Sequence, residues 1–87
     1  MGIAHADLFR NLAAAIDQRP HRVDGGVIHV DDGPHRIVIR YSAEGERRIG
    51  ALRLPFTVLE FRFEGHDEAV VNAFMECFRR AYQRGGG

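Results

Sequence analysis

Residues 26–64 alternate apolar and polar side chains with a period of two, and this alternation constrains the fold more than any other feature of the chain. Turn signals interrupt it at three places: Asp32-Gly33, Glu44-Gly45 and Pro55-Phe56. Successive side chains of a strand point to opposite faces of a sheet. The pattern therefore predicts four strands, at residues 26–31, 34–42, 46–54 and 57–64. Because short turns join neighbouring strands, we expect one antiparallel meander.

The three turns also predict a register. Two-residue turns would pair Ile28 with Ile37, Ile37 with Leu52, and Leu52 with Leu59. A slip of one residue would scatter these side chains over both faces, so the register decides which residues form the core. On the predicted core face, Gly50 would leave room for a neighbouring aromatic ring. The predicted core face consists of Ile28, Val30, Ile37, Ile39, Leu52, Leu54, Leu59, Phe61 and Phe63.

Helical periodicity flanks the strands at both ends. Residues 4–18 carry an apolar stripe, and Pro20 is expected to end that helix and open a loop over residues 20–26. Asp67 is a candidate N-cap for a second helix over residues 68–84, which Gly85 would stop. The apolar stripes are Leu8, Leu12, Ala15 and Ile16 in the first helix, and Val70, Val71, Phe74, Phe78 and Tyr82 in the second.

The order of elements is α-β-β-β-β-α, which predicts an α+β fold. Two helices side by side match the width of four strands, so both are expected on one face of the sheet, in a two-layer sandwich. The 87 residues contain no repeat and no linker, and they are predicted to form a single α+β domain over residues 1–87.

Two helices on one face leave the other face of the meander uncovered. We expect that face to act either as an interface with a protein partner or a second copy, or as an anion-binding surface for RNA or another polyanion. A third interpretation is an ordinary solvated face whose arginines cover β-branched residues. The candidate residues are Val27, Arg36, Val38, Arg40, Ile49, Arg53, Val58 and Arg62.

The residue inventory argues against catalysis. The chain has no lysine, which excludes Schiff-base chemistry and the lysine of a phosphate-binding loop, and it offers few hydroxyl nucleophiles. Its five histidines show no metal-ligand spacing, and Cys77 is expected to be packed and inert. We therefore expect a non-catalytic protein with no cofactor and no metal.

The single cysteine, the absence of a signal-like start and the lack of a long apolar run favour a cytoplasmic protein that does not enter membranes. A homodimer or another homo-oligomer is the favoured state, while nucleic acid is the disfavoured partner.

The chain ends in Gly85-Gly86-Gly87. This terminus resembles that of the ubiquitin-like sulfur carriers and modifiers, whose flexible Gly-Gly tail enters an adenylating enzyme. The resemblance covers only those residues, and the family has a β-grasp fold that opens with a hairpin. It implies a third function, that of a sulfur or conjugation carrier acting through Gly87.

Overall fold

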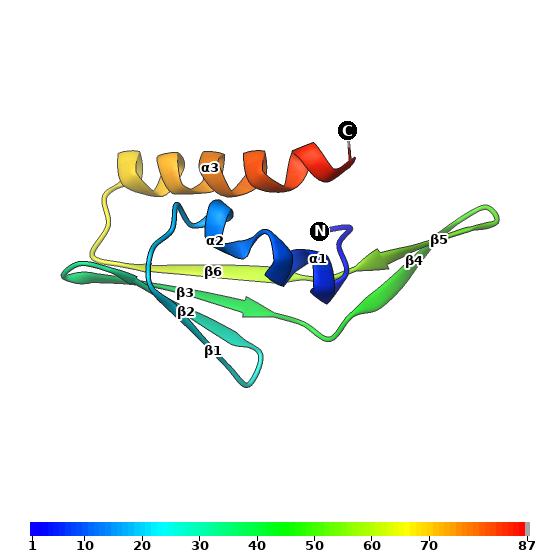
Figure 1. Cartoon of the computed structure of the whole chain (residues 1–87), viewed down its shortest axis with the longest axis horizontal. Helices are drawn as coiled ribbons and strands as arrows, with labels where there is room; N and C mark the ends of the chain where they lie inside the picture. The colour runs from blue at the N-terminus through cyan, green and yellow to red at the C-terminus, as the bar shows by residue number, and fades with distance from the viewer. Residues whose placement is uncertain (87) are drawn as a thin grey trace.

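A computed structural model describes the backbone of residues 1–86 and the side chains of residues 1–83. The helices are α1 (His5–Arg10), α2 (Leu12–Ala15) and α3 (Glu68–Gly86). The strands are β1 (His21–Asp24), β2 (Val27–Asp32), β3 (His35–Tyr41), β4 (Gly45–Ile49), β5 (Leu52–Phe56) and β6 (Leu59–Glu64). The helices lie on the same side of a four-stranded antiparallel sheet in the order β1-β2-β3-β6 (Figure 1). The predicted α+β class and its two layers are confirmed.

The core lies between the helices and the sheet. Ile28 and Val30 of β2 and Ile37 and Ile39 of β3 alternate with outward residues and are fully or almost fully buried. The predicted stripe of the first helical segment is buried too, and Phe74 and Phe78 of α3 complete the core. Apolar burial of this kind is the main driving force of folding.

The helix boundaries differ from the prediction in two respects. The first helical segment is broken at Asn11, and both Asp17 and Gln18 have a positive φ, so helical backbone ends before Pro20. Asp67 caps α3 as predicted, because the Val70 amide donates to its Oδ1 at 3.0 Å. The helix continues through Gly85, which is therefore not its stop. Gly87, on which the carrier hypothesis depends, lies outside the described residues.

The predicted meander is wrong, because the strand that follows β3 in the sequence is not its neighbour in the sheet. β3 pairs with β6, so Ile37 lies opposite Phe63 and Ile39 opposite Phe61, while Ile28 pairs with Ile39. The turn between β2 and β3 is Gly33-Pro34, which shifts that register by two residues from the prediction. A shift of two preserves the face of every side chain, and this is why the predicted core residues of β2 and β3 are nevertheless correct.

Residues 45–56 do not enter the main sheet. β4 and β5 form a separate two-stranded antiparallel hairpin, here called the arm, which extends beyond the end of β6 (Figure 1). Its tip is Gly50-Ala51, where Gly50 has a φ of +60°, so Gly50 makes a turn and not the predicted space beside a ring. Pro55, expected in a turn, lies inside β5. Leu52 and Leu54 are consequently exposed and do not belong to the core.

The fourth strand of the main sheet is β1, which the sequence places in a loop. Gly25 and Gly26 both have positive φ and form the tight turn that pairs Asp24 with Val27. All four residues of β1 are exposed, so no alternation of apolar residues marks it in the sequence. A Gly-Gly pair before a strand is the hairpin signal that could have revealed it.

Candidate functional site

The face of the main sheet opposite the helices, here called the outer sheet face, carries three rows of side chains. They are Asp24, Val27, Arg40 and Glu60; Arg22, His29, Val38 and Arg62; and Asp31, Arg36 and Glu64. In the part of the chain that the structure describes, no helix or strand covers this face. Val27, His29 and Val38 are half-buried at its centre, and the arginines around them are exposed. The centre is therefore mildly apolar and the margin is charged.

The charges of the outer sheet face cancel. Its rows contain four arginines and four carboxylates, because β1 contributes both Arg22 and Asp24, and Arg53, predicted on this face, lies in the arm. Oppositely charged residues also face each other directly, as in the pairs Asp31–Arg36 and Arg40–Glu60. Cross-strand pairs of opposite charge stabilise a sheet, and together they leave this face without a field of one sign.

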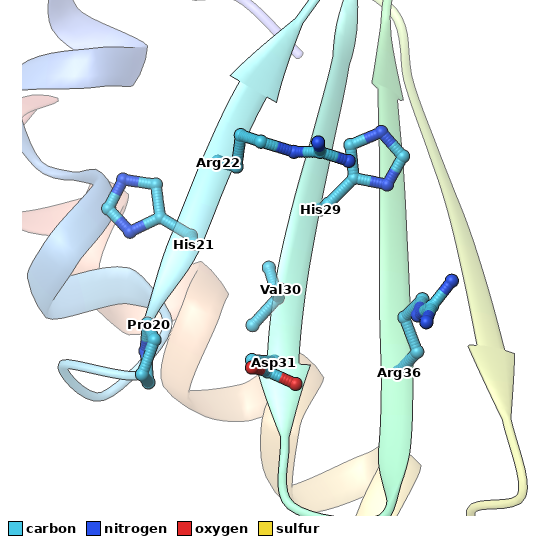
Figure 2. A pocket seen from close by; sticks show the side chains of 7 residues that line it. All are labelled: Pro20, His21, Arg22, His29, Val30, Asp31 and Arg36. Carbon is cyan, nitrogen blue, oxygen red and sulfur yellow. The ribbon is translucent and has the colours of Figure 1, made fainter.

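A shallow hollow of about 310 Å³ lies at the edge of the outer sheet face (Figure 2). Figure 2 shows the Arg22 side chain extending across β2 toward the ring of His29, while the Arg36 side chain points away from Asp31. The mixture of cationic groups with a carboxylate gives the hollow no clear preference for an anion.

The arm has one apolar side. Ile49 lies opposite Leu52 and Arg47 opposite Leu54 on that side, and Phe56 lies at its base. The Arg47 guanidinium stacks over the Phe56 ring at 4.9 Å from its centroid, which is a cation–π contact. Arg47 thus covers the base of the arm, and the aliphatic side chains nearer the tip remain uncovered.

The apolar side of the arm continues into the outer sheet face along one strand. Thr57, between β5 and β6, is fully buried and its hydroxyl donates to the carbonyl of Ile3 at 2.8 Å. Val58 therefore points to the opposite side, where it is 53% exposed. Because side chains alternate, every second position on either side of Val58 shares its direction. Those positions are Leu52, Leu54, Phe56, Glu60 and Arg62.

We call the combination of the outer sheet face, Val58 and the apolar side of the arm the outer surface. The structure places six of the predicted site residues together on the main sheet or next to it: Val27, Arg36, Val38, Arg40, Val58 and Arg62. Ile49 lies on the apolar side of the arm, and Arg53 points the other way, paired with Arg48. Leu52 and Leu54 were missed, because the predicted register assigns them to the core.

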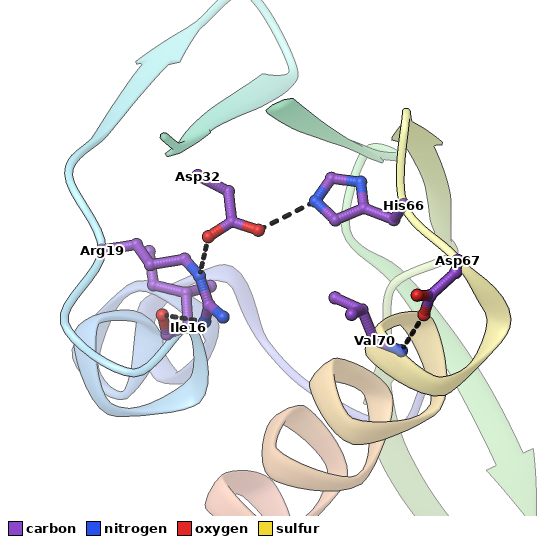
Figure 3. Close-up of polar contacts among 6 residues, drawn as sticks. All are labelled: Ile16, Arg19, Asp32, His66, Asp67 and Val70. Carbon is purple, nitrogen blue, oxygen red and sulfur yellow. Dashed lines mark hydrogen bonds and ion pairs between the residues drawn. The ribbon is translucent and has the colours of Figure 1, made fainter. Parts of the chain in front are cut away.

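A partly buried polar network joins the segment after α2, the end of β2 and the segment before α3 on the helix side of the molecule (Figure 3). The Arg19 Nε donates to Asp32 Oδ1 at 2.9 Å, and the second oxygen of Asp32 lies 2.8 Å from His66 Nε2. The hydrogen bond from Arg19, and to a smaller extent the one with His66, holds the pKa of Asp32 below its ordinary value of 3.8. The His66 side chain is only 1% exposed, although it lies in the connection between β6 and α3.

This network stabilises the fold and offers no complete catalytic arrangement. His66 Nδ1 is buried without a hydrogen-bond partner among the described residues, and the rings of His35 and Phe63 pack beside it. A histidine–carboxylate pair needs a nucleophile or substrate within reach to act as a base. The rings recorded beside His66 belong to His35 and Phe63, neither of which supplies a hydroxyl or thiol nucleophile, so the geometry favours a structural role.

Other candidate sites receive no support from the geometry. Among the described residues, no group of three or more His, Cys, Asp or Glu side chains is arranged to hold a metal ion. Cys77 is half-buried in α3, with its Sγ 3.8 Å from the carbonyl oxygen of Ala14. No helix in the described part of the chain has the length and apolar character needed to cross a membrane.

Comparison with protein-family models, with curated proteins and with solved structures gives no match to this chain, so its function is argued from the outer surface itself.

Proposed function

We propose that this protein is a small, non-catalytic interaction protein that associates with a protein partner through its outer surface. The observation that carries the proposal is the exposure of the arm. Ile49 is 56% exposed, Leu52 is 62% exposed and Leu54 is 41% exposed, all on one side of the same hairpin. Clustered exposed aliphatic side chains of this kind mark interaction sites, whereas single ones are ordinary.

The energetics of the arm support the same function. An isolated two-stranded hairpin is at best marginally stable in water. Burying a Leu or Ile side chain contributes about 1.5–3 kcal/mol, so a partner that covers the three aliphatic side chains would stabilise the arm substantially. Association would thus supply the packing that the arm lacks within its own chain.

Polyanion binding is the second candidate, and the outer sheet face gives it little support. The four arginines there are matched by four carboxylates. The arm carries Arg47, Arg48 and Arg53 against Glu46, which leaves a net charge of +2 on that element. Nucleic-acid affinity grows with the number of phosphates that are neutralised. A positive excess as small as this one therefore supports only weak binding.

Self-association of the purified protein tests the proposal in the case where the partner is a second copy. We would compare the wild type with the pair Ile49→Ser/Leu52→Ser on the apolar side of the arm, and with Arg48→Ser/Arg53→Ser on the opposite side as the matched control. Sedimentation velocity from micromolar to millimolar concentration should show association of the wild type and of the control, and its loss in the apolar pair.

Amide hydrogen exchange of residues 45–56 provides a second measurement. If association covers the arm, protection of these amides rises with protein concentration, because only the associated state shields them. Arm amides that exchange freely in a protein that nevertheless associates, together with identical sedimentation of the two variants, would contradict the proposal.

A further inference from the structure

We propose that the partner is a second copy of this chain, packed outer surface to outer surface about a twofold axis near Val58, so that the arm of each copy lies over the outer sheet face of the other. The proposal rests on the proposed function, because it names the partner of the same surface. In this arrangement the aliphatic side of the arm of one copy contacts the half-buried centre of the other copy's sheet, at Val27 and Val38.

The positions of the two apolar patches favour this arrangement. The arm patch and the sheet centre lie at opposite ends of one surface, and Thr57, next to Val58, is the midpoint of the strand path from Leu52 to Arg62. A twofold contact is self-complementary. If the arm of the first copy meets the sheet centre of the second, then the arm of the second copy also meets the sheet centre of the first. Rotation about an axis beside Thr57 and Val58 carries Leu52 onto Arg62 of the other copy, and Arg62 pairs with Val38 on β3.

The charges of the surface are compatible with a second copy. A face of one sign would repel itself, whereas the outer sheet face has equal numbers of arginines and carboxylates. On the apolar side of the arm, Arg47 is the single charged residue, and its guanidinium is already placed over Phe56. The whole chain has a formal net charge of zero, which removes long-range repulsion between copies.

The dimensions of the molecule allow a stable contact. The described chain measures 47 × 28 × 20 Å, so its broad side is large compared with the roughly 800 Å² per partner that a standard interface buries. The two halves of the outer surface follow one another along the long dimension (Figure 1). Two copies placed antiparallel can therefore overlap along both the arm and the sheet.

Cross-linking between two single-cysteine variants tests the arrangement. Both variants carry Cys77→Ser; one also carries Leu52→Cys at the end of the arm, and the other Val38→Cys at the centre of the sheet. A short bismaleimide is added to each variant alone and to an equal mixture, after light scattering has established the mass of each in solution. Reciprocal packing predicts about tenfold more cross-linked dimer in the mixture than in either variant alone, because proximity raises the effective concentration of the thiols.

Each other outcome has a definite meaning. Efficient cross-linking of Leu52→Cys alone would show the two arms packed against each other, and efficient cross-linking of Val38→Cys alone would show the sheet centres in contact; either overturns the reciprocal arrangement but keeps the outer surface as an interface. A monomeric wild type at millimolar concentration would overturn the second copy as partner. A dimer that survives Ile49→Ser/Leu52→Ser would contradict the proposed function as well.

Discussion

At the scale of single residues, the least expected feature is the burial of His66. The sequence places it in a loop between β6 and α3, where a histidine is ordinarily solvated. In the structure its ring is enclosed and its Nε2 is bound to Asp32, which Arg19 also contacts. The network connects the segment after α2, the end of β2 and the start of α3. It therefore holds the helical layer on the sheet.

Replacing Asp32 with Asn tests this network. The substitution removes a charge-assisted contact to Arg19 and the charged partner of His66, and groups of this kind contribute about 1–3 kcal/mol when they are lost from a partly buried site. We expect the free energy of unfolding to fall by that amount at neutral pH, as measured by urea unfolding. An Asp31→Asn variant, at the neighbouring exposed position, is the control and should change little.

The same contacts predict a pH dependence. The pKa of Asp32 is lowered by Arg19 and His66 in the folded protein, whereas in the unfolded chain it lies near 3.8. The stability that Asp32 adds is therefore complete above pH 3.8 and is lost as the pH falls below that value and through the folded pKa. Unfolding curves of the wild type and Asp32→Asn should converge in acid, and a constant difference down to the lowest pH would contradict this explanation.

At the scale of elements, β3 and the arm differ in how much they contribute to the stability of the monomer. β3 pairs with both neighbours and buries Ile37 and Ile39 completely, whereas β4 and β5 pair only with each other. The same alternation of apolar and polar residues thus occurs in a core strand and in an exposed hairpin. The difference between them is the presence of a helical layer over one and not the other.

Alanine substitutions measure that difference. Ile37→Ala should lower the free energy of unfolding by about 2–5 kcal/mol, because it leaves a cavity in the core. Leu52→Ala should cost less than about 0.5 kcal/mol in dilute protein, because the side chain is largely exposed. Urea unfolding at low protein concentration provides the comparison. Equal costs would show that Leu52 is packed in the monomer, as the predicted meander requires.

At the scale of the whole molecule, one side is covered by helices and the other is open. The helical side contains the core and the polar network, and the open side contains aliphatic groups among balanced charges. A surface of that composition favours contact with another protein over contact with a polyanion, because binding a polyanion needs an excess of positive charge.

A nucleic-acid titration tests this preference. With charges balanced on the outer sheet face and a net charge of +2 on the arm, we expect no measurable binding of single-stranded RNA at physiological salt. If binding occurs at low salt, log affinity should fall with log salt by about 0.7 per phosphate contact, and Arg47→Ser should reduce the slope. Micromolar affinity at physiological salt, abolished by Arg40→Glu, would instead favour the polyanion function.

Much of the helical layer and of the central strands could be predicted from the sequence, since periodicity is local. The stripe through Leu8 and Leu12, the Asp67 cap and the alternation through Ile37 and Ile39 each depend on neighbouring residues along the chain. For the same reason the outward direction of Val38 was predictable even though its pairing was not: a shift of two residues leaves every side chain on its face.

The partners of the strands were decided only in three dimensions. Gly50 is compatible with both a strand interior and a turn, and the choice depends on whether β3 gains more by pairing with residues 46–54 or with β6, whose Phe61 and Phe63 pack against α3. The second pairing places Phe61 and Phe63 directly beside β3 and leaves residues 45–56 as the arm. The exposure of Leu52, and with it the candidate interaction surface, follows from that long-range competition and not from any local pattern.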